Sequence, residues 1–276
     1  MLRCIAGFSF IAIVGMSFGV FADNRVQTRL ISDFETARAG STIRVGEQFE
    51  IPELSHIYWR NPGDSGLATG IEWMVDDSVE VGALSWPAPR QFSIEGLENE
   101  AYFGYTRRAL LYSEIKVPDG AALNASVVIR AKAYWLLCED DGVCTPEEKE
   151  LFISIRVQEE SRLAYESTLF DRWAAEVPEA AKSGRVKWTL EPSLAMTVVP
   201  PKGMDILGSV GKRALRFVPN DGGGWTGTRD DDGKVRFEPN YSGDKANGGV
   251  LVLPIRNRLS GEQFVRFLAV KAPETP

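Results

Sequence analysis

The chain has 276 residues, with 31 basic against 38 acidic side chains, a net charge of −7 and a single histidine. The acidic balance excludes a nucleic-acid-binding protein, because no basic stripe is available to neutralise phosphates. The length is sufficient for two domains of ordinary size, each with its own core.

The chain begins with a predicted secretory signal peptide, residues 1–22. One positive charge at Arg3 is followed by an apolar stretch over residues 5–21, and a small residue, Ala22, precedes the first acidic residue. A membrane-anchoring helix is the alternative, because the apolar stretch is close to the length that spans a bilayer. No later apolar run approaches the roughly 18 residues of a transmembrane helix, so we expect the mature chain to be soluble.

The first half of the mature chain is predicted to consist of short β-strands. Short apolar runs alternate with turn-rich segments, of which residues 61–64 (NPGD) and 86–89 (WPAP) are two. Strands at this spacing favour a β-sandwich. The expected strands include residues 43–45, 70–75, 91–94 and 109–117.

Two further runs predict an antiparallel hairpin with cysteines at its turn. Residues 127–137 alternate between apolar and polar side chains, and residues 151–157 repeat this period of two. Cys138 and Cys144 lie between them, and cleavage of the signal peptide would remove Cys4, the third cysteine. We therefore expect the cysteine loop to join two paired strands in a compartment where disulfides persist.

The second half begins with a predicted connecting helix. Residues 159–184 contain apolar side chains at approximately helical spacing, although Pro178 must end or kink the helix. Residues 185–276 are predicted to form a second, smaller β domain, which leaves residues 23–158 as the first. The six expected strands are residues 186–190, 194–199, 214–218, 234–238, 249–255 and 263–270.

The cysteine pair allows three interpretations. A structural disulfide across so short a loop would remove about 2 to 3 kcal/mol of chain entropy from the unfolded state. Metal binding needs more ligands than two thiolates, and the single histidine, His56, is far away in sequence. A redox pair is the third possibility. The nearby acidic side chains disfavour thiolate formation, which suits a relay that reacts when a partner docks; they are Glu139, Asp140, Asp141, Glu147 and Glu148.

Four motifs in order resemble one family. They are residues 56–66 (HIYWRNPGDSG), 86–89 (WPAP), 102–105 (YFGY) and 135–147 (WLLCEDDGVCTPE). This series resembles the N-terminal periplasmic domain of the thiol:disulfide interchange protein DsbD, in particular the ScsB type, over about residues 41–157. The later helix and β region look like the longer ScsB-type N-terminal portion. The resemblance implies an immunoglobulin-like β-sandwich in the periplasm.

The resemblance also implies a function as a protein-disulfide reductase relay. Cys138 and Cys144 would carry electrons from a membrane-embedded thiol reductase to oxidised periplasmic thioredoxin-like or isomerase proteins, with no cofactor. Cys144 would react with the donor and Cys138 would attack the target. Proteins of this family continue into a membrane domain, whereas this sequence ends at Pro276 without one, so we expect the donor to be a separate protein.

An aromatic cap loop that shields the disulfide is a further implication of the resemblance. Tyr102 and Phe103 match the cap segment, which would protect the thiols from wasteful oxidation. Glu100 is a candidate for tuning the thiols, and an ordinary solvated carboxylate is the alternative.

The remaining motif residues have structural interpretations, and the whole domain has a rival one. Residues 61–64 are expected to build a turn. Four aromatic side chains are expected in the core: Tyr58, Trp59, Trp86 and Trp135. The rival hypothesis for the protein is a periplasmic binding module or copper-tolerance accessory whose disulfide only staples the hairpin.

Overall fold

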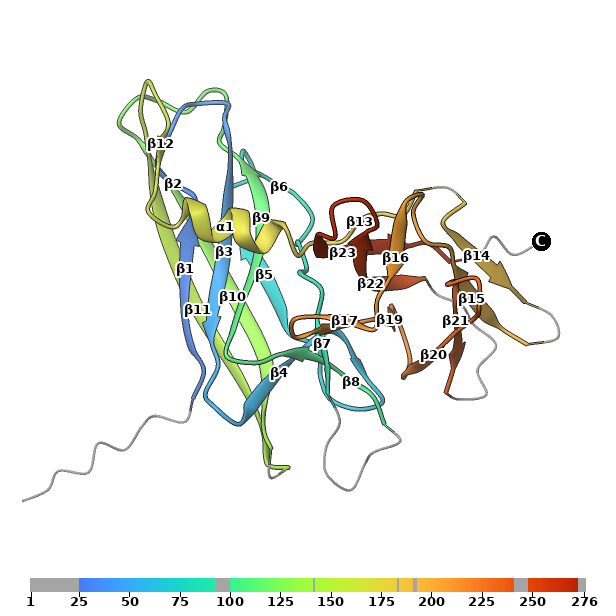
Figure 1. Cartoon of the computed structure of the whole chain (residues 1–276). Helices are drawn as coiled ribbons and strands as arrows, with labels where there is room; N and C mark the ends of the chain where they lie inside the picture. Colours follow the sequence, from blue (N-terminus) through green and yellow to red (C-terminus); the bar gives the residue numbers. More distant parts are fainter. Residues whose placement is uncertain are drawn as a thin grey trace, which may run out of the picture.

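A computed structural model describes residues 25–92, 100–140, 142–182, 184–190, 193–240 and 248–272. The predicted signal peptide, residues 1–22, lies outside this range. Among the described residues, no helix is long and apolar enough to cross a membrane. The described chain consists of β-strands and one helix, arranged in two lobes (Figure 1).

The first lobe is the predicted immunoglobulin-like sandwich of two sheets, whose facing side chains form a buried core. One sheet has the order β1 (Gln27–Ser32), β3 (Thr42–Glu50), β9 (Arg108–Lys116) and β6 (Glu80–Val81). The other has the order β12 (Arg162–Leu163), β2 (Phe34–Ala37), β11 (Cys144–Val157), β10 (Ser126–Glu139), β4 (Ser55–Gly63), β8 (Tyr102–Tyr105) and β7 (Arg90–Phe92), and β5 (Gly70–Met74) also pairs with β10.

The predicted hairpin is formed by β10 and β11, which pair in antiparallel register from Ser126 opposite Arg156 to Cys138 opposite Cys144. Alternation along β10 buries the apolar positions that the sequence predicted and exposes the polar ones. The hairpin runs the length of the first lobe, and its turn lies at one end of that lobe (Figure 1). The fold therefore places the two cysteines at an end of the sandwich.

The connecting helix is shorter than the sequence predicted. Only α1 (Ser167–Ala174) is helical, where residues 159–184 were expected. Before it, β12 pairs with the edge strand β2, and after it β13 (Glu179–Ala180) pairs with a strand of the second lobe. Both ends of the segment therefore pair with strands instead of continuing the helix. The buried Phe170 packs α1 against Tyr112 of the sandwich.

The second lobe contains all six predicted strands in two main sheets and a small ribbon. One sheet has the order β13, β23 (Gln263–Val270), β22 (Gly249–Asn257) and β16 (Met204–Ile206), and β19 (Arg216–Pro219) also pairs with β22. The other has the order β14 (Val186–Thr189), β15 (Ala195–Val198), β21 (Val235–Pro239) and β20 (Trp225–Arg229). The ribbon joins β17 (Ser209–Val210) to β18 (Arg213–Ala214).

The two lobes share part of their core. One cluster of buried side chains contains Trp59 and Tyr105 of the first lobe together with Val218, Val250 and Phe267 of the second. In Figure 1 the strands β19 and β20 lie beside the end of the first lobe that carries β7 and β8. The sequence predicted a separate core for each domain, whereas the structure joins them through apolar packing.

Candidate thiol–disulfide site

Cys138 and Cys144 form a disulfide at the end of the β10–β11 hairpin. The strand register places them directly opposite one another, with their Cα atoms 4.1 Å apart. The turn between them is closed by a hydrogen bond from the Glu139 N–H to the Val143 carbonyl, 2.8 Å long. Among the described residues, no group of three or more His, Cys, Asp and Glu side chains is placed to hold a metal ion.

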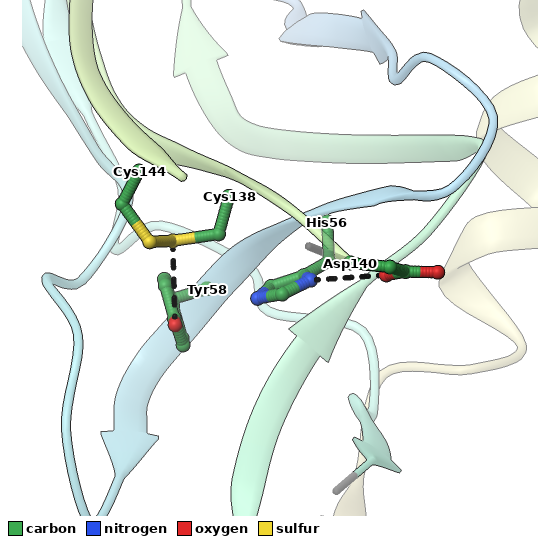
Figure 2. The surroundings of a disulfide bond; sticks show 5 residues. All are labelled: His56, Tyr58, Cys138, Asp140 and Cys144. Carbon is green, nitrogen blue, oxygen red and sulfur yellow. Dashed lines mark hydrogen bonds and ion pairs between the residues drawn. A yellow bond between two sulfur atoms is a disulfide. The ribbon is translucent and has the colours of Figure 1, made fainter. Parts of the chain in front are cut away.

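The two sulfur-bearing residues differ sharply in exposure. Cys138 is 1% exposed, whereas Cys144 is an exposed residue. The Tyr58 hydroxyl of β4 lies 3.5 Å from Cys138 Sγ and donates a hydrogen bond to it (Figure 2). An attacking thiol therefore has access to Cys144, while Cys138 is the sulfur that receives a protein hydrogen bond.

Two tyrosines, Tyr58 and Tyr102, cover Cys138 and are here called the tyrosine pair. Both are buried and form one apolar cluster with Cys138, against which Phe92 and Leu136 pack. Burial raises the pKa of each tyrosine above its ordinary value, with a smaller contribution from Tyr102 in the case of Tyr58. Both hydroxyls consequently stay protonated at neutral pH and are available as donors.

The three residues predicted from the resemblance as cap and tuning residues do not all reach the disulfide. Tyr102 belongs to the tyrosine pair, and its hydroxyl donates a hydrogen bond to the Glu100 carboxylate. Phe103, the next residue of β8, faces the opposite way and is buried in the core shared by the two lobes. Residues 93–99, between β7 and β8, lie outside the described residues. Glu100 thus contacts the disulfide cluster through Tyr102 rather than directly.

His56 is a site residue with no predicted role at the disulfide: it begins the first of the four motifs and was considered as a metal ligand. It lies opposite Cys138 in the β4–β10 pairing, is 3% exposed, and packs its ring on Phe92 at 4.3 Å between centroids. Burial lowers its pKa to about 4, although Asp140, at 4.0 Å from Nδ1, opposes the shift (Figure 2). The imidazole is therefore neutral at neutral pH and adds no positive charge beside the disulfide.

The predicted negative potential around the cysteines is partly compensated in the structure. Glu147 accepts hydrogen bonds from Arg25, at 3.1 Å, and from Trp135 Nε1, at 2.9 Å. Glu148 forms an ion pair with Lys132 at 3.1 Å. Each of these two carboxylates is therefore paired within the first lobe, which partly neutralises its charge. Asp141 lies outside the described residues.

Two exposed apolar side chains flank the disulfide. Leu54, which precedes β4, is 77% exposed, and Val143, next to Cys144, is 57% exposed. The Leu54 carbonyl accepts a hydrogen bond from the Asp140 N–H, which ties this loop to the cysteine turn. Leu54 also has a φ of 57°, a left-handed conformation that residues with a branched side chain rarely adopt. Exposed apolar side chains therefore lie on the cysteine turn and on the loop that is hydrogen-bonded to it.

The segment predicted as a turn, residues 61–64, is different in the structure. Asn61 to Gly63 are the end of β4, whose pairing with β8 shifts register between Tyr58 and Gly63. Asn61 is 4% exposed and reaches the second lobe, which no sequence pattern indicated. The core prediction fits Trp59 and Trp135, while Trp86 is half-buried.

Comparison with known proteins identifies the first domain. Residues 27–155 match the family described as thiol:disulfide interchange protein DsbD, N-terminal. No match was found among curated proteins.

Two solved structures are similar to the chain. The N-terminal periplasmic domain of ScsB from Proteus mirabilis aligns over 91% of this chain and 95% of that chain, with 17% identity and a TM-score of 0.54. The N-terminal domain of Neisseria meningitidis DsbD in the reduced form aligns over 47% of this chain and 90% of that chain, with 16% identity and a TM-score of 0.24.

The ScsB likeness covers both lobes and shows a shared fold. The family match covers the strands that carry the disulfide, the tyrosine pair and His56. Residues 27–155 therefore belong to the family of DsbD N-terminal domains, the N-terminal part of thiol:disulfide interchange proteins.

Proposed function

We propose that this chain is a periplasmic thiol–disulfide exchange protein that relays electrons through Cys138 and Cys144. The donor is a membrane-embedded thiol reductase, and the acceptors are oxidised thioredoxin-like or isomerase proteins. One observation carries the proposal: within a DsbD N-terminal domain, the disulfide joins an exposed cysteine, Cys144, to a buried cysteine, Cys138, whose sulfur accepts a hydrogen bond. The periplasmic location rests on the likeness to the ScsB and DsbD domains.

Reduction of the disulfide begins at the accessible sulfur. A donor thiolate attacks Cys144 Sγ, the S–S bond breaks, and Cys138 leaves with the bonding electron pair. The Tyr58 hydroxyl, already 3.5 Å from Cys138 Sγ, stabilises the developing thiolate. A second donor thiol then attacks its own sulfur in the mixed disulfide and releases Cys144. Two electrons have moved, and the donor leaves as a disulfide.

Delivery to the acceptor uses the same sulfur. The Cys144 thiolate attacks the acceptor disulfide and forms a mixed disulfide, which Cys138 resolves by attacking Cys144 Sγ. This assignment replaces the expectation from the resemblance that Cys138 attacks the target. With 1% of its surface exposed, Cys138 offers an external disulfide no line of approach, whereas it already lies beside Cys144.

Partner docking is proposed to occur on the apolar surface around Cys144. Val143 precedes Cys144 in the turn, and Leu54 belongs to the loop that is hydrogen-bonded to this turn. Both are exposed, and exposed apolar side chains at a reactive centre fit a transient protein contact. The contact would also remove water from the disulfide. A relay of this kind reacts slowly with small oxidants and quickly with a docked partner.

Single-cysteine variants test the assignment. Reduced Cys138→Ser keeps the accessible thiol and lacks the resolving one, so it should accumulate a mixed disulfide with a purified, oxidised thioredoxin-fold disulfide isomerase. Cys144→Ser, the matched control, should accumulate none. The adducts are counted on non-reducing gels and located by mass spectrometry. Equal trapping by Cys144→Ser would overturn the role of Cys144, and no trapping by either variant would contradict the exchange function.

A further inference from the structure

We propose that the second lobe sets the reactivity of the disulfide by holding residues 61–66, the segment that packs on the tyrosine pair. The proposal rests on the proposed exchange function and adds a positioning role for a domain remote from the sulfurs. In the structure, one side of this segment is bound by the second lobe and the other side contacts both tyrosines. The loop of the second lobe that makes these contacts is residues 219–224, here called the clamp loop.

The clamp loop binds the end of β4 through side-chain amides. Asn61 Nδ2 donates to the Pro219 carbonyl at 2.8 Å and to the Gly222 carbonyl at 3.1 Å. Its Oδ1 accepts from the Gly63 N–H at 3.0 Å, so one buried side chain fixes both its own segment and the second lobe. Next to it, Arg60 donates to Asn220 Oδ1 at 2.9 Å. The Arg60 contact is exposed, whereas the Asn61 side chain is buried, and its hydrogen bonds are costly to leave unmade.

Two glycines bring the clamp loop into close contact with the first lobe. A Cβ atom on Gly223 would lie 2.2 Å from Asp64 Oδ1, and one on Gly224 would lie 2.9 Å from the Ala101 Cβ. Contacts this short leave no space for a methyl group at Gly223. The clamp loop thus reaches the backbone immediately before Tyr102, as well as the 61–66 segment.

Asp64 transmits this contact to β8. Its N–H donates to the Ala101 carbonyl at 3.0 Å, and its carboxylate Oδ2 accepts from the Ala101 N–H at 2.7 Å. Asp64 therefore hydrogen-bonds both the N–H and the carbonyl group of Ala101. Because Ala101 directly precedes Tyr102, Asp64 is a positioning residue for this half of the tyrosine pair.

The same segment contacts the tyrosine side chains. The Ser65 side chain is hydrogen-bonded to the Tyr102 side chain. Gly66 lies against Tyr58, since a Cβ atom there would be 2.6 Å from the phenol ring. Unbroken contact therefore runs from the clamp loop through residues 61–66 to the tyrosine pair and on to Cys138. A shift of the clamp loop would therefore be passed on to the tyrosine pair, because a closely packed interior has few voids that could absorb it.

Loosening the clamp should move the tyrosine pair away from Cys138 and weaken the Tyr58 hydrogen bond that stabilises the departing thiolate, so reduction of the disulfide should slow. Asn61→Asp keeps the side-chain shape and the acceptor for Gly63 but removes both donors to the clamp loop. Gly223→Ala removes no hydrogen-bonding group but adds one methyl group against the Asp64 carboxylate, which must shift, so it carries the test if Asn61→Asp does not fold. Arg213→Gln is the matched control, because it breaks the ion pair of the second lobe with Glu176, away from the clamp loop.

The experiment measures the second-order rate constant for reduction of the full mature chain by dithiothreitol, well below the unfolding temperature. Asn61→Asp and Gly223→Ala should each be reduced about three- to tenfold more slowly than the wild type, the effect of weakening or losing one ordinary hydrogen bond to the leaving sulfur. Arg213→Gln should stay within about twofold of the wild type, although all three variants lose some stability.

The proposal would be overturned if both clamp variants were reduced at the wild-type rate while losing as much stability as the control. The clamp loop would then serve only the stability of the fold. Failure of the exchange function would appear elsewhere, as an absence of trapped mixed disulfide with Cys138→Ser. The two failures are therefore distinguishable.

Discussion

Tyr58 is the side chain that makes the two sulfurs of the disulfide chemically unequal. It was expected from the sequence to be a core aromatic residue, and it is buried, yet its hydroxyl donates to Cys138 Sγ. The sequence could indicate the burial, since aromatic residues dominate sandwich interiors. It could not indicate the hydroxyl contact, because that depends on which strand lies beside β10 at Cys138.

Removing the Tyr58 hydroxyl should slow reduction of the disulfide. Tyr58→Phe keeps the ring that covers Cys138 but deletes the donor to the leaving sulfur, so dithiothreitol should reduce the variant about three- to tenfold more slowly. Stopped-flow mixing followed by alkylation of the released thiols measures the rate. Tyr102→Phe is the control, because its hydroxyl binds Glu100 and not sulfur. A rate equal to that of the wild type would contradict the role of Tyr58 in stabilising the departing thiolate.

At the scale of the elements, β3 carries a buried carboxyl group, Glu47, on its inward face. Glu47 is fully buried on the same face as Ile43, Val45 and Phe49. Burial raises its pKa from 4.5 to about 7, against smaller opposing contributions from Thr28 and Lys149. Between those two pH values the folded chain keeps a proton that the unfolded chain releases, so this group makes stability fall as pH rises through the window.

Glu47→Gln should therefore stabilise the protein at high pH. The gain over the wild type should be near zero below pH 4.5, grow through the window, and reach about 2 to 3 kcal/mol at pH 8. Urea unfolding curves of both proteins, recorded at a series of pH values, give the difference in unfolding free energy. A difference that does not change with pH would show that Glu47 is ionised in the folded state as it is in the unfolded chain.

Strand patterns were predictable where local alternation decides them. The alternation in β10 and β11 predicted the hairpin, and each of the six later runs is a strand of the second lobe, although β16, β17 and β20 were not predicted. The helix and the turn were less predictable. Residues 162–163 and 179–180 have apolar neighbours at helical spacing but pair with strands. At the end of β4, Gly63 pairs with Tyr102 of β8 and Asn61 binds the second lobe. Long-range partners override local preference at these places.

At the scale of the whole molecule, the two lobes act as one packed unit. They share a buried cluster and several hydrogen bonds between the end of β4 and the clamp loop. Composition and strand pattern predicted two β domains but gave no indication of this contact, because the residues that make it lie some 160 positions apart, as in the pair Asn61 and Gly222. The site therefore depends on both lobes even though both cysteines come from one hairpin.

The reduction potential of the Cys138–Cys144 pair tests the account most directly. The full mature chain is equilibrated in defined thiol buffers, and the alkylated thiols are counted at each potential. We predict a value of roughly −180 to −270 mV, where known exchange proteins lie. A value below about −300 mV would identify a structural disulfide, contradict the relay, and favour the binding module whose disulfide only staples the hairpin.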